Sequence, residues 1–161
     1  MADATEENQE WFEPGLSFEC TQCGNCCTGP PGYVWFTDEE AKAMAAFMKM
    51  DENAFRDHFA TVLAGQWSLK ELKRDGQYDC VFLDRDKEGK ALCSIYSARP
   101  KQCRTWPFWS ENLTSEKEWR LAKQICPGMN SGNFFPADQV RLVRDKDMEH
   151  DEARVFLEKN K

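Results

Sequence analysis

The stretch Cys20-Thr21-Gln22-Cys23-Gly24-Asn25-Cys26-Cys27 places four thiols close together near the start of the chain. A C-x2-C turn lets two thiolates approach one metal ion while backbone N–H groups point at the sulfurs. Two such spacings overlap here, and a vicinal cysteine follows them. Eight thiols in all match the count that two four-thiolate sites require. We expect all of them to be metal ligands: Cys20, Cys23, Cys26, Cys27, Cys80, Cys93, Cys103 and Cys126.

Two other uses of these cysteines are disfavoured. Unliganded cysteine packs like a small hydrophobe, but the regular spacing argues against that reading. A disulfide framework needs an oxidising compartment, and the acidic start Met1–Glu7 lacks the basic and apolar regions of a signal peptide. There is also no run of about 18 apolar residues that could span a membrane. We therefore expect a cytoplasmic protein.

The sequence leaves open how the cysteines divide between two sites. Because adjacent side chains diverge, we expect Cys26 and Cys27 to serve different sites. Both sites would be closed, with little room for a substrate. One partition joins either vicinal cysteine to Cys20, Cys23 and Cys126, and the other vicinal cysteine to Cys80, Cys93 and Cys103.

Zinc in two four-cysteine sites is the leading interpretation, and an iron–sulfur cluster is the alternative. The pattern C-x2-C-x2-C followed later by Cys126-Pro127 is similar to that of bacterial ferredoxins, in which the last ligand precedes proline. It departs from that pattern because Cys27 directly follows Cys26. Charge does not separate the two metals, since both four-thiolate centres leave about two negative charges. Arg99 and Arg104 flank Cys103 and are expected to offset this charge.

Few other residues suggest chemistry. His58 lies between Asp57 and Phe59 in a helical pattern and His150 lies in an acidic tail, so neither is expected to bind zinc. No Ser-x-Gly elbow, phosphate loop or dinucleotide fingerprint occurs, so we expect no catalytic residue and lean against an enzyme. The net charge of -7 argues against a nucleic-acid binder. The expected partner is a metal ion, together with an unidentified protein.

The expected fold is a small, irregular, metal-stabilised α+β domain with several short helices and a short β-hairpin. Metal, more than a hydrophobic core, is expected to decide this fold. We predict a flexible N-terminal lead over residues 1–15, although Trp11 and Phe12 are expected to dock onto the domain. The cysteine-cluster metal-binding domain then covers residues 16–132, and a charged helical extension of it covers residues 133–161.

Local patterns predict the elements of this domain. Capping boxes at Thr37 and Ser115 predict helices that begin after them, and Asp51 predicts a further helix that runs to about Leu63 and stops at Gly65. Short strands are predicted at residues 33–36, 80–83 and 91–96, the last two joined as a hairpin that brings Cys80 and Cys93 together. Residues 97–109 are predicted to be mostly loop, and residues 137–144 and 151–158 to be helical.

A family resemblance rests on three motifs: the opening Cys20-x2-Cys23-x2-Cys26-Cys27, the segment from Cys93 through Arg99-Pro100 to Cys103-Arg104-x-Trp106-Pro107, and Cys126-Pro127-Gly128. In this combination the chain resembles the bacterial YkgJ-type cysteine-cluster family, the CxxCxxCC domain that chelates zinc or iron. The resemblance implies eight metal-ligand cysteines in a small cytoplasmic protein. Flagellin lysine methylases carry a similar cysteine-rich region, for which an iron–sulfur cluster is implied.

Overall fold

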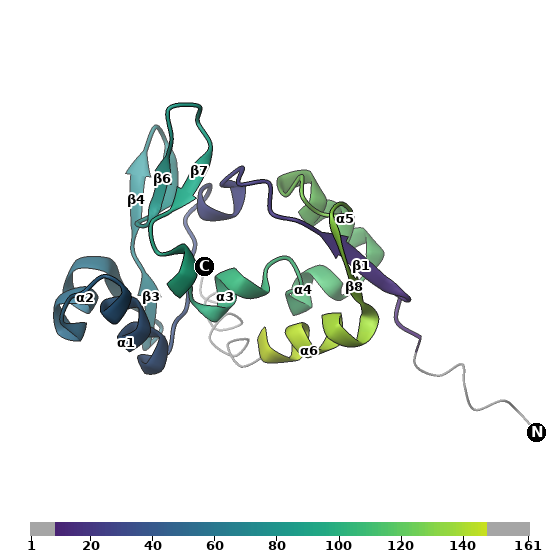
Figure 1. Ribbon diagram of the computed structural model, residues 1–161, viewed down its shortest axis with the longest axis horizontal. Coiled ribbons are helices and arrows are strands. Elements are labelled where there is room, and N and C mark those ends of the chain that lie inside the picture. Colours follow the sequence, from purple (N-terminus) through teal and green to yellow (C-terminus); the bar gives the residue numbers. More distant parts are fainter. Residues whose placement is uncertain (1–8, 148–161) are drawn as a thin grey trace, which may run out of the picture. The chain divides into compact units, whose positions relative to one another are not determined.

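The computed structural model describes residues 9–147, which form two compact units (Figure 1). The first unit combines residues 9–21 with residues 107–147, and the second comprises residues 22–106. Short helices and separate two-stranded antiparallel sheets occur in both units, which confirms the α+β class. The predicted boundaries after residues 15 and 132 stay predictions, and the helix predicted at residues 151–158 lies outside the described residues.

In the first unit a two-stranded sheet accompanies the helices. Strand β1 (Gly15–Phe18) pairs antiparallel with β8 (Asn133–Pro136), a pairing that the sequence analysis did not anticipate. The helices are α4 (Ser110–Leu113), α5 (Glu116–Ile125) and α6 (Ala137–Asp147). Helices α5 and α6 begin where the sequence predicted them.

The chain before β1 packs into the first unit. Phe12 is 2% exposed, and Trp11 Nε1 donates a hydrogen bond to the carbonyl oxygen of Leu113 at 2.7 Å. Arg141 of α6 forms an ion pair with Glu10 at 2.6 Å. The prediction that Trp11 and Phe12 dock onto the domain is confirmed.

In the second unit two helices precede three successive hairpins, and three short helical segments carry the connections. The hairpins pair β2 with β3, β4 with β5 and β6 with β7. The bounds are η1 Asn25–Cys27, α1 Asp38–Phe47, α2 Glu52–Phe59, β2 Ala60–Leu63, β3 Gln66–Leu69, β4 Glu71–Arg74, β5 Gln77–Cys80, β6 Leu83–Arg85, β7 Ala91–Cys93, η2 Tyr96–Ala98 and α3 Lys101–Thr105.

Side-chain caps start both long helices of the second unit. Thr37 and Glu40 form a capping box, in which each side chain accepts the backbone N–H of the other residue at 3.2 and 2.8 Å. Asp51 accepts the N–H groups of Asn53 and Ala54 at the start of α2. These caps satisfy N–H groups that have no partner within the helix, and they confirm the predicted starts of both helices.

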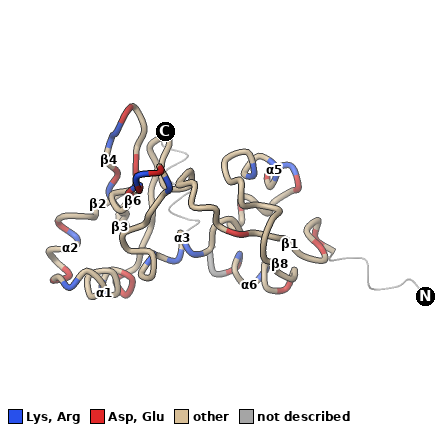
Figure 2. Tube along the Cα trace, turned by 45° about the horizontal axis from the view of Figure 1, so that its top comes forward, with Lys and Arg blue, Asp and Glu red and all other residues tan. Residues whose placement is uncertain are grey.

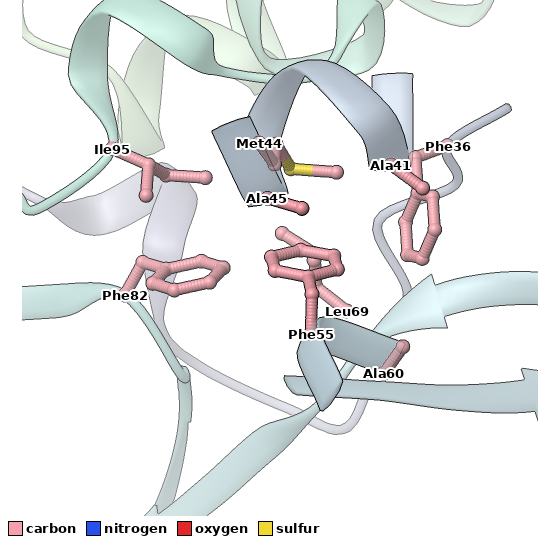
Figure 3. Close-up of a cluster of buried hydrophobic side chains, with 9 residues drawn as sticks. All are labelled: Phe36, Ala41, Met44, Ala45, Phe55, Ala60, Leu69, Phe82 and Ile95. Carbon is pink, nitrogen blue, oxygen red and sulfur yellow. The ribbon is translucent and has the colours of Figure 1, made fainter. Parts of the chain in front are cut away.

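An aromatic core forms between these helices and the hairpins (Figure 3). Phe55 is fully buried, and its ring lies 6.1 Å from that of Phe36 and 6.2 Å from that of Phe82, centre to centre. Cys80 and Cys93 are partly buried against this core. The hairpins that carry two of the cysteines are therefore held by ordinary hydrophobic packing.

Three predictions of local structure need correction. The helix predicted to reach Leu63 ends at Phe59, because residues 60–63 form β2 and turn back through Ala64 and Gly65, both with positive φ. The strand predicted at residues 33–36 is reduced to a bridge between Trp35 and Ser68. The predicted loop at residues 97–109 contains η2 and α3.

Charged residues of both signs lie along α1 and along β4 (Figure 2). Across residues 9–147, no helix is both long enough and apolar enough to cross a membrane.

Candidate metal centre

The loop that carries Cys23, Cys26 and Cys27 is held by the β6–β7 hairpin. Arg85 of β6 donates to the carbonyl oxygen of Cys23 at 3.2 Å and to that of Gly89 at 3.0 Å. The N–H of Ala91 donates to the carbonyl oxygen of Gln22 at 2.9 Å. The hairpin that ends at Cys93 therefore also positions the start of the cysteine loop.

Gly24 is required at the turn of this loop. Its φ is +78°, a left-handed conformation that side chains disfavour. A Cβ at this position would lie 2.7 Å from the Cβ of Ala91 and 3.0 Å from a guanidinium nitrogen of Arg85. The N–H of Cys27 then donates to the carbonyl oxygen of Gly24 at 2.9 Å and closes the short helix η1. Only glycine allows the loop to approach the hairpin this closely.

Backbone N–H groups point at three of the sulfurs in the second unit. The N–H of Asn25 lies 3.5 Å from Cys23 Sγ. The backbone groups of Phe82 and Ile95 hydrogen-bond the thiols of Cys80 and Cys93 in the same way, again from two residues further on. A bond of this kind favours the charged thiolate, which is the form that binds metal.

Four thiols of the second unit act on one another electrostatically. Burial is the largest cause that raises the pKa of Cys103, and the charges of Cys80, Cys26 and Cys93 raise it further. Burial also raises the pKa of Cys80 to about 11, with a contribution from Cys93. The thiols come from η1, β5, β7 and α3, so four separate elements bring Cys26, Cys80, Cys93 and Cys103 into one neighbourhood.

The vicinal cysteines lie closer together than expected. Their sulfurs are 3.8 Å apart and in hydrogen-bonding contact, so the side chains do not diverge. This contact, followed by burial, raises the pKa of Cys26. Whether the two thiols serve one site or two stays a prediction.

The first unit contains Cys20 and Cys126. Cys126 is buried and ends α5, as predicted, where its N–H donates to the carbonyl oxygen of Ala122 at 3.0 Å. Cys20 is exposed, and its neighbour Glu19 donates its N–H to the carbonyl oxygen of Gly128 at 3.1 Å. Within this unit, the residue before Cys20 is therefore hydrogen-bonded to the turn that follows Cys126.

Arg99 and Arg104 differ in what they contact. The positive charge of Arg99 lowers the pKa of Cys26, Cys93 and Cys103, although larger effects raise all three. Its guanidinium lies 3.8 Å from the ring centre of Tyr96. Arg104 instead pairs with Glu40 at 3.7 Å. The predicted electrostatic effect on the cysteines is therefore present for Arg99, whereas that of Arg104 stays a prediction.

His58 contacts the backbone of its own helix. The Nδ1 atom of His58 lies 2.8 Å from the carbonyl oxygen of Ala54, one helical turn earlier in α2. His150 lies outside the described residues.

The donor set fits a thiolate-bound metal in chemistry, although the side chains are not closed around a point. Within residues 9–147, no three histidine, cysteine or acidic side chains are grouped tightly enough to hold a metal ion as they stand. The thiols can still shift one another's pKa, because charges act over longer distances than a metal–ligand bond. Zinc or iron held by these thiols would draw the sulfurs inward and would favour the thiolate form.

Sequence reasoning missed several residues around these cysteines. Arg85, which holds the cysteine loop, was assigned only to a polar turn. The β4–β5 hairpin, which ends at Cys80, was also missed, although Asp75-Gly76 is a strong signal for a two-residue turn. Both turn residues have positive φ, as that turn requires.

These features describe a cysteine-rich domain whose thiols suit a metal ion in their chemistry. The chain belongs to the CxxCxxCC family, whose model carries the description "Putative zinc- or iron-chelating domain" and matches residues 19–127. The family resemblance inferred from the motifs is confirmed, and a metal-binding role follows from it. No solved structure matches the chain.

Proposed function

We propose that this protein holds zinc through its eight cysteine thiolates and acts as a structural or accessory module. The observation that carries the proposal is the neighbourhood of Cys26, Cys80, Cys93 and Cys103 in the second unit. We assign these four thiols to one four-cysteine site. The proposal also takes the four remaining cysteines as metal ligands: Cys20, Cys23, Cys27 and Cys126.

The electrostatics of the four thiols support a site that is completed by a cation. Burial and mutual repulsion favour their neutral forms, which raises the pKa of Cys80 and Cys103. A divalent ion reverses this balance, because it neutralises the charges that repel one another. The N–H groups directed at Cys80 and Cys93 favour the same thiolate forms. Bound zinc would supply cross-linking between elements, and its binding free energy would add to folding stability.

The proposed setting is the cytoplasm, where the thiols stay reduced and available to the metal. The eight cysteines, all within residues 9–147, form no disulfide in the structure. An accessory role follows from the four-thiolate count, since a closed four-cysteine site leaves no coordination position for a substrate.

Metal content decides between zinc and iron. The protein is purified anaerobically, and its colour, metals and acid-labile sulfide are measured. We expect a colourless protein with about two zinc ions per chain. A brown protein with acid-labile sulfide would instead establish an iron–sulfur protein, suited to electron transfer or methylase-like chemistry.

A further inference from the structure

The sulfurs of the two vicinal cysteines are directed at each other. Cys26 Sγ and Cys27 Sγ lie 3.8 Å apart and in hydrogen-bonding contact. Neither thiol is part of a disulfide in the structure. Because a disulfide bond is about 2.05 Å long, the two sulfurs need to approach by only about 1.7 Å to form one.

The chain on both sides of this pair is held by a hairpin. Before the pair, Arg85 of β6 donates to the carbonyl oxygen of Cys23 at 3.2 Å. Directly after the pair, the hydroxyl of Thr28 donates to the carboxylate of Asp79 in β5. These contacts join residues that are more than 50 positions apart in the chain. The fold, as well as adjacency in sequence, therefore sets the contact between the two sulfurs.

Both thiols are within reach of a small molecule. Cys26 is exposed and Cys27 is partly exposed, whereas Cys126 is buried. Both vicinal cysteines also line a pocket of about 120 Å³. One water molecule requires about 10–15 Å³ of such a volume, so the pocket admits several atoms of a reagent. An oxidant in solution can therefore reach the pair in the folded chain.

Cys23 is the other thiol that sequence spacing offers to Cys26, through the C-x2-C motif. The sulfur of Cys23 accepts the N–H of Asn25 at 3.5 Å. The sulfur of Cys26 is instead in contact with that of Cys27. The geometry therefore favours a bond within the vicinal pair over a bond across the C-x2-C motif.

A bond between adjacent cysteines is strained. Two Cα atoms joined by a trans peptide lie about 3.8 Å apart, whereas the Cα atoms of a disulfide usually lie about 4.4–6.8 Å apart. Strain of this kind makes the bond easier to reduce, and strained or exposed disulfides are the labile and regulatory ones. A bond in this pair is therefore suited to form and break rather than to cross-link the fold permanently.

We infer that Cys26 and Cys27 form a reversible vicinal disulfide, with a small-molecule disulfide such as oxidised glutathione as the oxidant. One protein thiolate attacks a sulfur of the oxidant, so that the S–S bond of the oxidant breaks, a mixed disulfide forms and one glutathione leaves. The second protein thiolate then attacks the first protein sulfur, the vicinal bond forms and the second glutathione leaves. Each cysteine sulfur loses one electron to a glutathione sulfur, and the two thiol protons pass to the released glutathione.

The vicinal bond changes how many thiols are available to a metal. This consequence rests on the proposed function, in which both cysteines are ligands. The thiolate is the form of cysteine that binds metal, so one bond withdraws two of the eight proposed ligands, and reduction restores both. The pair therefore links metal retention to the balance between thiols and disulfides around the protein.

The test treats the metal-free full chain with oxidised glutathione and maps the product by mass spectrometry of its peptides. We expect the peptide that holds Cys26 and Cys27 to lose two hydrogens, and to regain them when excess reduced glutathione is added. The absence of a bond, a bond from Cys23 to Cys26, or a bond that reduced glutathione does not open would each overturn the inference.

Two matched variants locate the bond. Cys23→Ser removes the competing thiol of the C-x2-C motif and should keep the loss of two hydrogens. Cys27→Ser should abolish that loss and leave a glutathione adduct on Cys26. A bond that disappears in Cys23→Ser, or that persists in Cys27→Ser, would overturn the assignment.

The same treatment in urea separates the effect of the fold from that of sequence adjacency. The unfolded chain has lost the contacts of Arg85 and Thr28, so we expect a mixture of bonds and glutathione adducts. Formation of the same single bond in urea would show that the folded contact does not select it.

Zinc affinity is measured separately, so this inference and the proposed function fail in different ways. The oxidised chain should bind zinc more than about 100-fold more weakly than the reduced chain, because residues that only support a ligand already alter affinity by about 10–100-fold. A vicinal bond with unchanged zinc affinity would overturn the link to metal retention. An untreated protein that contains no zinc would overturn the proposed function and leave the vicinal disulfide standing.

Discussion

Replacing Cys103 by serine removes one sulfur from the proposed four-thiolate site at its most connected position. Of the four cysteines, Cys103 alone lies on an α-helix, α3, where its N–H donates to the carbonyl oxygen of Pro100 at 3.0 Å. The charges of Cys80, Cys26 and Cys93 all act on it. The serine hydroxyl keeps nearly the same shape but does not form a stable thiolate-like bond to zinc.

The expected effect differs between the metal-free and the zinc-loaded protein. At pH 7 the metal-free thiol is neutral, because burial and its neighbours raise its pKa, so the substitution should change the free energy of unfolding by about 1 kcal/mol or less. Residues that only support a ligand alter metal affinity by about 10–100-fold. Loss of a ligand itself should lower the zinc affinity by more than about 100-fold. At saturating zinc this removes about 2.7 kcal/mol of zinc-dependent stability.

The assay is urea unfolding of wild type and Cys103→Ser at pH 7, with excess zinc and with excess chelator. Thr105→Ser is the control, since it alters the same helix and keeps the hydroxyl that donates to Gln102. It should leave the zinc-dependent part of the stability unchanged. If Cys103→Ser kept the zinc-dependent stability of wild type, the assignment of Cys103 as a ligand would be wrong.

Three further predictions concern the core, the thiols and the cysteine loop. Phe55→Ala should lower the free energy of unfolding of metal-free protein by about 3–5 kcal/mol in urea titrations, because it empties the centre of the aromatic core, and a loss below about 1 kcal/mol would contradict that role. Burial raises the pKa of Cys80 from 9.0 to about 11, so the folded state holds this proton more tightly than the unfolded state. The contribution of Cys80 to the stability of the metal-free protein should therefore be fully present below about pH 9 and should be lost toward pH 11, as measured by urea unfolding across that range. Cys80→Ser should flatten this decline, and an equal decline of stability with pH in wild type and variant would exclude Cys80 as its source. Arg85→Ala should speed amide hydrogen exchange at residues 22–27 and change global unfolding by about 0.5 kcal/mol or less, whereas unchanged exchange would show that Arg85 does not hold the loop.

Local chemistry predicted the helices best. The caps at Thr37, Asp51 and Ser115 each depend on a side chain and an N–H within three residues, so the sequence contains everything needed to identify them. The motif that ends at Cys126-Pro127-Gly128 likewise identified both the end of α5 and the family.

The end of α2 was harder to predict, because apolar residues at helical spacing continue beyond it. Val62 and Leu63 fit the helical pattern, but Ala64-Gly65 forms a two-residue turn that pairs β2 with β3. Val62 lies opposite Trp67 in that pairing, a contact with a residue that a helical window does not include. A tight turn thus overrode a helical pattern that was periodic but short.

The surroundings of the cysteines could be predicted only in part. Spacing identified the ligand candidates, and the polar turn predicted the hairpin that β6 and β7 form. The strand predicted at residues 80–83 was wrong, because Cys80 ends β5 and Leu83 begins β6. The contact of Gly32 with Glu71 could not be predicted, because the two residues are 39 apart in the chain and are joined by a backbone-to-carboxylate bond that no local pattern encodes. The hold of Arg85 on Cys23 is long-range in the same sense.

X-ray absorption at the zinc edge of the anaerobically purified protein tests the central claim most directly, because it reports the atoms bound to the metal. Our account predicts a single shell of sulfur at about 2.3 Å with four sulfurs per zinc. A shell of nitrogen or oxygen at about 2.0–2.1 Å, or iron in place of zinc, would contradict it.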